Sequence, residues 1–214
     1  MLVKICGITT PETAVACIKA GVNIIGLVHY PPSPRHVDIA EICEICDALN
    51  RPDRLLDRRI ALVIVDQYPK LPRTINLHIR YLQNYGDKNL KCNRLQKPIH
   101  VVKNFETFTR LLNSTPSHEE EYYCIEMSKG LLPGGNGAEW DWSIARPFCE
   151  RYNTFIAGGI TPENVGDVTR LVNPFGIDVS SGVESSPGVK DMDKVKRLID
   201  NVHKAHRARR VSGG

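Results

Sequence analysis

Residues 177–182, Ile-Asp-Val-Ser-Ser-Gly, place one acid and three small residues at the end of a short apolar run. Serine and glycine leave backbone N–H groups open to close approach, and successive N–H groups in such a turn can form an anion site. The pattern indicates a phosphate ligand, with Asp178 beside it to accept a hydrogen bond from a hydroxyl. An ordinary turn rich in serine and glycine uses the same residue types, so this stretch alone leaves both interpretations open.

A second turn of the same design precedes the first. The apolar run 154–157 leads into Gly158 and Gly159, and Thr161-Pro162-Glu163 has the composition of a helix start. Two consecutive strand–turn–helix units near the C-terminal end of a chain are typical of the phosphate site of a (β/α)8 barrel. The predicted phosphate-binding residues are Gly158, Gly159, Ser180 and Ser181.

Three further side chains stand where strands are expected to end. Cys6 could serve as a base or nucleophile near a phosphate site, although an isolated cysteine is more simply a buried structural residue. Arg35 ends a proline-rich stretch that could aim its guanidinium at a carboxylate, and a solvated surface arginine is the alternative. Glu126 precedes the loop that contains Gly134 and Gly135, and a carboxylate facing Cys6 across a barrel mouth is a candidate acid–base pair.

Apolar, β-branched runs alternate with helical patterns along the chain. Strands are predicted at Leu2–Cys6, Ile24–Tyr30, Ile60–Val65, Tyr81–Tyr85, Ile99–Lys103, Tyr122–Glu126, Thr154–Ala157 and Gly176–Val179. Helices are predicted at Pro11–Ala20, Ile39–Leu49, Pro69–His78, Glu106–Asn113, Trp142–Tyr152, Pro162–Val172 and Met192–Arg207. This alternation predicts an α/β fold, a single (β/α)8 TIM barrel over residues 1–207, followed by a disordered basic tail over 208–214. Residues 86–97 are too polar for a convincing fourth helix, so an open flavodoxin-like sheet is the alternative.

Composition limits the classes of partner. The 214 residues are 42% hydrophobic, and the net charge of +4 is partly carried by residues 203–210, which we interpret as a solvated helix end and not a nucleic-acid site. No apolar run reaches the roughly 18 residues of a membrane span. Seven cysteines without an export signal favour the cytoplasm, and Cys43 and Cys46 are interpreted as packing residues because no second pair at zinc spacing accompanies them.

Together these motifs resemble the phosphoribosylanthranilate isomerase family of tryptophan biosynthesis. The resemblance runs in order through the chain, at Val3–Thr9, Tyr30–His36, Gly134–Gly137 with Trp140–Trp142, Ala157–Asn164 and Ile177–Glu184. It implies a small phosphoribosyl substrate and an Amadori rearrangement without a metal or cofactor.

The resemblance also implies a role for each site residue. Cys6 matches the general base, Glu126 the candidate general acid and Arg35 the group that holds the anthranilate carboxylate. Asp178 matches the acid beside the ribose hydroxyls, the residues of the two turns match the phosphate loops, and Gly134 and Gly135 match the loop after strand six.

The chain departs from the family pattern at three strand ends. The family usually has an aspartate where Glu126 stands, Phe-Val-Asn where residues 64–67 read Ile-Val-Asp-Gln, and Gln-Leu-His-Gly where residues 83–86 read Gln-Asn-Tyr-Gly. From this pattern, Glu126→Asp is expected to keep or raise the activity. Two alternatives stay open: an isomerase for a different phosphoribosyl arylamine, and a homologue that binds a sugar phosphate without turnover. The sequence does not predict an oligomeric state.

Overall fold

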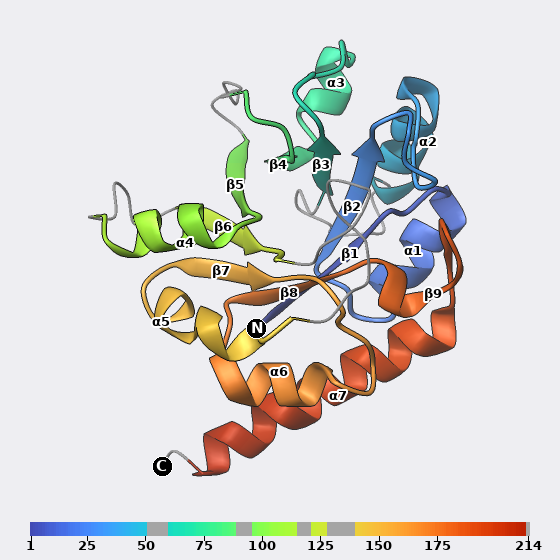
Figure 1. Ribbon diagram of the computed structural model, residues 1–214. Helices are drawn as coiled ribbons and strands as arrows, with labels where there is room; N and C mark the ends of the chain where they lie inside the picture. Colours follow the sequence, from blue (N-terminus) through green and yellow to red (C-terminus); the bar gives the residue numbers. More distant parts are fainter. Residues whose placement is uncertain (51–59, 89–95, 115–120, 128–139, 213–214) are drawn as a thin grey trace.

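A computed structural model of the protein describes residues 1–50, 60–88, 96–114, 121–127 and 140–212 (Figure 1). Eight parallel strands follow one another in sequence order and close into a barrel. They are β1 (Leu2–Cys6), β2 (Ile24–His29), β3 (Ile60–Ile64), β4 (Ile79–Asn84), β5 (Lys97–Val102), β6 (Tyr122–Ile125), β7 (Asn153–Ile156) and β8 (Gly176–Val179). Because β1 pairs with both β2 and β8, the sheet is closed. The predicted TIM barrel is confirmed, and an open sheet is excluded.

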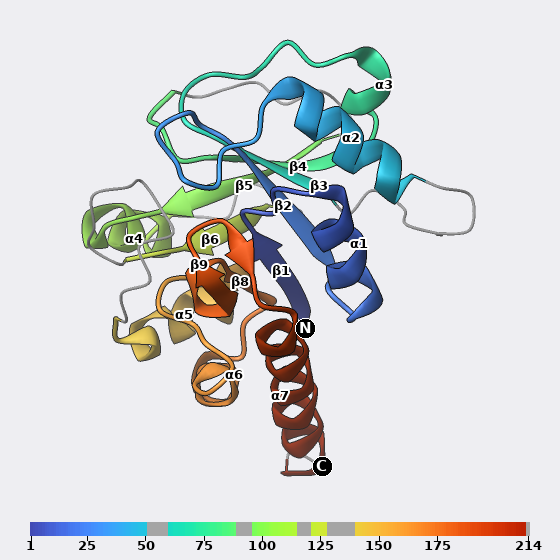
Figure 2. The ribbon, with the colours of Figure 1, turned by 90° about the vertical axis from the view of Figure 1, so that its right-hand side faces the viewer.

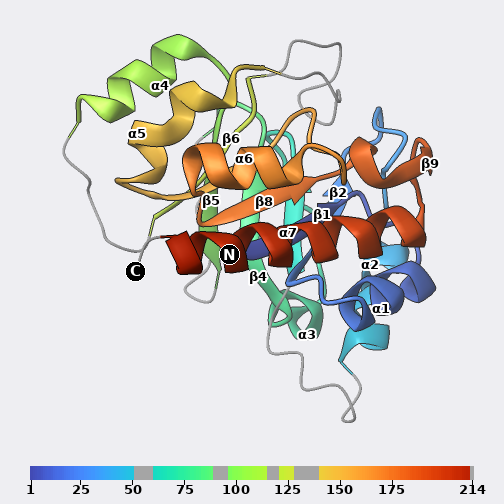
Figure 3. The same ribbon diagram turned by 90° about the horizontal axis from the view of Figure 1, so that it is seen from below.

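Helices surround this barrel. They are α1 (Pro11–Lys19), α2 (Ile39–Leu49), α3 (Arg73–Asn76), α4 (Phe105–Leu112), the 3-10 turn η1 (Trp142–Ala145), α5 (Arg146–Cys149), α6 (Val165–Val172) and α7 (Met192–Ser212). After β8 come the 3-10 turn η2 (Ser181–Val183) and a small antiparallel ladder of β9 (Glu184–Ser186) and β10 (Val189–Lys190). Helices α1 and α2 lie side by side in Figure 2, and α6 and α7 do so in Figure 3.

Strand alternation divides the buried residues into two groups. On β1, Val3 and Ile5 point outward into the core between the strands and the helices. The barrel interior holds a separate apolar cluster of Ile24, Ala61, Ile99, Cys124, Phe155 and Ala157. Lys4 and Gln83 are fully buried polar residues on inward-facing positions of β1 and β4. The barrel interior therefore holds buried polar side chains beside apolar ones.

Two predicted helices are much shorter than expected because of proline. The helix predicted at Pro69–His78 is only Arg73–Asn76, with Pro72 at its N-cap. Pro72 has no N–H and disfavours helical geometry at the residue before it, so the helix cannot begin earlier. The helix predicted at Trp142–Tyr152 divides into η1 and α5, with Pro147 in the first turn of α5. Pro147 likewise cannot donate the hydrogen bond that would join the two pieces.

Two helix ends also differ from the prediction. Helix α6 begins at Val165 instead of Pro162, although the Thr161 hydroxyl accepts hydrogen bonds from the backbone N–H groups of Glu163 and Asn164, as a cap residue does. Helix α7 continues to Ser212, whereas we expected it to end at Arg207 and a disordered tail to follow. Alanine and arginine favour helix, and no glycine or proline interrupts the chain before Gly213.

Candidate active site

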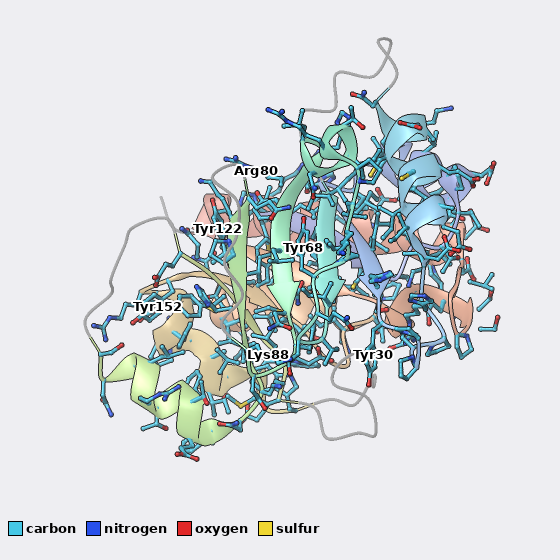
Figure 4. The ribbon with its side chains drawn as sticks, turned by 90° about the horizontal axis from the view of Figure 1, so that it is seen from above. Tyr30, Tyr68, Arg80, Lys88, Tyr122 and Tyr152 are labelled. Carbon is cyan, nitrogen blue, oxygen red and sulfur yellow. The ribbon has the colours of Figure 1, made fainter. Side chains whose placement is uncertain are left out.

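A pocket opens at the carboxyl ends of the strands. Figure 4 shows this end of the barrel by Tyr30 and Lys88, which follow β2 and β4, whereas Arg80 and Tyr122 lie toward the opposite end. Every predicted site residue that the structure describes lines the pocket: Cys6, Arg35, Glu126, Gly158, Gly159, Asp178, Ser180 and Ser181. Gly134 and Gly135 lie outside the described residues. Side chains far apart in the sequence thus meet in one concave site, as small-molecule sites require.

The two glycine- and serine-containing turns touch each other at one side of this pocket. Gly158 and Gly159 have φ values of 84° and 69°, a backbone conformation that favours glycine. The Asn164 side chain donates a 2.8 Å hydrogen bond to the Gly159 carbonyl and fixes the first turn. In the second turn, a Cβ on Gly182 would lie 1.9 Å from the carbonyl oxygen of Ile160. Only glycine therefore allows the two turns to approach so closely.

Below Cys6, a buried ion pair crosses from β1 to β8. The fully buried Lys4 places its Nζ 2.6 Å from Oδ2 of Asp178, its partner in the strand register. The other oxygen, Oδ1 of Asp178, is buried and has no hydrogen-bond partner among the described residues. Because buried polar atoms are almost always satisfied, an acceptor left over on the pocket wall points to a ligand donor.

The same charges set the protonation of the Cys6 thiol. Burial raises the pKa of Cys6 above its ordinary value; Lys4 and Lys190 oppose this shift, and Asp178 adds to it. Burial alone would lower the pKa of Lys4, but the ion pair with Asp178 outweighs it, and the pKa of Lys4 is raised. Lys4 is therefore a permanent cation, and Cys6 is mostly a thiol at neutral pH.

We expect alkylation of Cys6 by iodoacetamide to be half-maximal at a pH above about 8.5, the ordinary thiol pKa, because only the thiolate reacts. Removing the cation with Lys4→Met should move the midpoint to still higher pH. Peptide mass spectrometry after timed alkylation separates Cys6 from the other cysteines. A midpoint below 8.5 would contradict this description of the site.

A second buried cluster holds Arg35. Its Nε and Nη2 atoms donate hydrogen bonds of 2.9 and 2.7 Å to the two carboxylate oxygens of Glu184. The fully buried ammonium of Lys190 lies 2.5 Å from Oε1 of Glu184. Burial raises the pKa of Glu184, but the two cations outweigh this effect and hold it below its ordinary value. The Arg35 guanidinium is thus buried and fixed by Glu184, and it is not a solvated surface side chain.

Glu126 follows β6 directly and is buried in the pocket wall. Its backbone N–H donates to the Val102 carbonyl, which continues the β5–β6 ladder and fixes the residue at the barrel mouth. Its Oε2 accepts a 2.6 Å hydrogen bond from the hydroxyl of Tyr85. The carboxylate therefore stands across the pocket from the β1 side with a defined orientation.

Four residues of the site were not predicted from the sequence: Lys4, Tyr85, Glu184 and Lys190. Lys4 carried a usable signal, because it lies two positions before Cys6 and so shares its inward face. Tyr85 was noted only as part of an altered strand end. Glu184 and Lys190 gave no signal, because their role depends on the approach of Arg35 from a distant loop.

Among the residues that the structure describes, no group of three or more His, Cys, Asp or Glu side chains is placed to hold a metal ion. No helix in the same ranges has both the length and the apolar character needed to cross a membrane.

Comparison with known proteins gives one consistent result. The family model described as N-(5'-phosphoribosyl)anthranilate (PRA) isomerase matches residues 3–201. The N-(5'-phosphoribosyl)anthranilate isomerase of Desulfatibacillum aliphaticivorans is 39% identical over 208 residues, covering 93% of this chain and 91% of the relative.

Solved structures give the same result. The crystal structure of phosphoribosyl anthranilate isomerase from Thermotoga maritima superimposes with a TM-score of 0.77 at 29% identity, covering 95% of this chain and 100% of that one. A phosphoribosyl anthranilate isomerase in complex with reduced 1-(o-carboxyphenylamino)-1-deoxyribulose 5-phosphate superimposes with a TM-score of 0.73 at 29% identity, with the same coverage.

Proposed function

This chain belongs to the N-(5'-phosphoribosyl)anthranilate isomerase family, and we infer from the pocket how its lining residues catalyse the isomerisation. The protein is an aldose–ketose isomerase of tryptophan biosynthesis. It catalyses the Amadori rearrangement of N-(5-phosphoribosyl)anthranilate to 1-(2-carboxyphenylamino)-1-deoxyribulose 5-phosphate.

The reaction needs one acid and one base. Glu126 donates a proton to the furanose ring oxygen, the C1–O4 bond breaks, and the anthranilate nitrogen lone pair forms the C1=N bond of an iminium. Cys6 acts in its thiolate form, the minor form at neutral pH, which Lys4 and Lys190 favour. It removes the proton from C2, which the adjacent iminium acidifies, and the electron pair forms the C1=C2 bond of an enolamine. The Glu126 carboxylate takes up the C2 hydroxyl proton and the Cys6 thiol gives its proton to C1, which produces the ketone and restores both side chains. No proton is gained or lost overall, and side chains of the chain carry out each step.

The binding groups fit the three polar parts of the substrate. The turns at Gly158–Gly159 and Ser180–Ser181 receive the phosphate, and Oδ1 of Asp178 accepts a hydrogen bond from a ribose hydroxyl. Glu184 occupies the Nε–Nη2 edge of Arg35. The anthranilate carboxylate therefore approaches the remaining edge, which carries Nη1 and the second N–H of Nη2.

The observation that carries this proposal is a single pocket lined by Cys6, Glu126, Arg35 and both turns. A chain that only bound a sugar phosphate would not need the cysteine and the guanidinium in that pocket. We further propose that the enzyme works in the cytoplasm without a metal, a cofactor or a nucleic-acid partner.

The function is tested by following the fluorescence of the anthranilate ring with freshly made N-(5-phosphoribosyl)anthranilate. The proposal expects a decay that saturates with substrate concentration. No decay, together with binding of the reduced product analogue, would favour a non-catalytic homologue. No decay and no binding would favour a substrate with a different aglycone, because the carboxylate and phosphate sites would then not fit the reduced product analogue.

We expect Glu184→Gln to raise KM about tenfold and to change kcat only about twofold, because Arg35 loses its charged anchor before the substrate carboxylate arrives. Glu163→Gln is the matched control, since Glu163 is exposed and pairs loosely with Arg197 at 3.7 Å. Steady-state kinetics measure both variants. An unchanged KM in Glu184→Gln would show that Glu184 does not orient Arg35 for the substrate.

A further inference from the structure

A buried chain of hydrogen bonds ends on the proposed general acid. The amide Nε2 of Gln83 lies 3.2 Å from the Tyr85 hydroxyl, and that hydroxyl donates a 2.6 Å hydrogen bond to Oε2 of Glu126. All three residues are buried. The phenol oxygen is therefore held from one side while its proton is directed at one carboxylate oxygen.

Strand alternation explains how these residues meet. Gln83 and Tyr85 lie two positions apart at the end of β4 and face the barrel interior, and Glu126 follows β6 on the same side. Strand β5 separates β4 from β6 in the barrel. A side chain as long as tyrosine is needed for the hydroxyl to pass β5 and reach the carboxylate.

The hydroxyl acts as a fixed donor. Burial raises the pKa of Tyr85 well above its ordinary value, and the charge of Glu126 raises it further. The phenol consequently keeps its proton, and it can only donate to Glu126. The 2.6 Å hydrogen bond fixes the position of Oε2 of Glu126.

We propose that Tyr85 is the positioning residue of the general acid: its hydroxyl holds one oxygen of Glu126, so that the carboxyl group is directed at the ring oxygen of the substrate. The inference rests on the proposed function, in which Glu126 donates the first proton. Glutamate has one more rotatable bond than aspartate, so a longer acid needs a partner that restricts it. Tyr85 supplies that restriction.

This role reverses the expectation from the sequence for Glu126→Asp. The shorter side chain would withdraw the carboxylate from the Tyr85 hydroxyl by about one bond length, and about 1 Å of misplacement can cost on the order of a hundredfold in rate. We therefore expect Glu126→Asp to lower kcat, not to keep or raise it.

The test is Tyr85→Phe, measured in the wild-type and in the Glu126→Asp background. In the wild type, the loss of the hydroxyl is expected to lower kcat about 10- to 100-fold and to leave KM within about twofold. In the Glu126→Asp background, the same change is expected to have almost no further effect, because the hydroxyl no longer holds the acid. The affinity for the reduced product analogue should be unchanged in all variants, which shows that the pocket is folded.

Tyr123→Phe is the matched control. The Tyr123 hydroxyl also donates to a carboxylate, Glu121, at 2.7 Å, but its ring packs against Phe148 and Tyr152 in the core outside the barrel. This variant should retain the kcat of the wild type.

Two results would overturn the inference. One is a Tyr85→Phe enzyme with the kcat of the wild type. The other is an equal loss in both backgrounds, which would mean that Tyr85 acts on the substrate or through packing and not through Glu126. Either result, obtained with an active wild-type enzyme, leaves the proposed function intact, whereas an inactive wild-type enzyme would refute the proposed function itself.

Discussion

Cys6→Ser is expected to lower kcat for N-(5-phosphoribosyl)anthranilate by about a thousandfold, within the range that a positioned acid or base contributes. A serine hydroxyl in the same place is not deprotonated near neutral pH, so no base remains for the C2 proton. The variant keeps the size and the local contacts of the side chain, including the hydrogen bond from Ser180 to the backbone carbonyl of residue 6. The anthranilate fluorescence assay measures the loss, and titration with the reduced product analogue should give an unchanged affinity.

The control for this variant is Cys43→Ser. Cys43 is a half-buried cysteine on the outer helix α2, and its replacement should leave kcat unchanged. If Cys6→Ser retained the wild-type kcat, Cys6 would not be the base. If it lost both turnover and affinity for the analogue, the cysteine would serve the structure of the mouth and not the proton transfer.

Local patterns in the sequence were sufficient for the barrel and for the two turns. Each strand combines β-branched residues with a turn at its end, and both signals can be recognised within a few consecutive residues. For this reason the eight strands were predicted to within two residues at each end. The glycines and serines of the turns are equally local, because the backbone geometry that they allow is their own property.

The partners of the proposed catalytic and binding side chains could not be predicted in the same way. Lys4 and Asp178 pair only because β1 and β8 close the barrel in one register. Tyr85 and Glu126 meet only because the tyrosine side chain at the end of β4 reaches across the barrel interior to the residue that follows β6. These contacts depend on the register of the strands and on how far a side chain reaches across the barrel. Neither can be predicted from one local segment of the sequence.

The lengths of two helices were predicted wrongly, although the residues that shorten them are visible in the sequence. Apolar periodicity suggested long helices around residues 69–78 and 142–152, but Pro72 and Pro147 each remove a backbone donor inside the predicted span. At both places the effect of the proline is stronger than that of the helical pattern around it.

Lys4→Met is expected to lower the free energy of unfolding by about 3–5 kcal/mol, the cost of leaving one partner of a buried ion pair uncompensated. Methionine fills a similar volume in the barrel interior but cannot neutralise Asp178, which is 6% exposed. The carboxylate would then remain buried with the Cys124 thiol as its remaining contact, at 3.8 Å. Urea unfolding, followed by intrinsic fluorescence, measures the change.

The double variant Lys4→Met/Asp178→Leu distinguishes the loss of a charge partner from the loss of packing. Replacing both ions of a buried pair by apolar residues is often neutral or stabilising, so the double variant should recover most of the lost stability although it would be inactive. If the single variant were as stable as the wild type, the ion pair would contribute nothing to the barrel. If the double variant were no more stable than the single one, the loss would come from packing around Lys4. Recovery of stability without activity would indicate that the ion pair is retained for the chemistry of the pocket. There Lys4 interacts with Cys6, the proposed base, and with Asp178, the proposed ligand of the ribose hydroxyls.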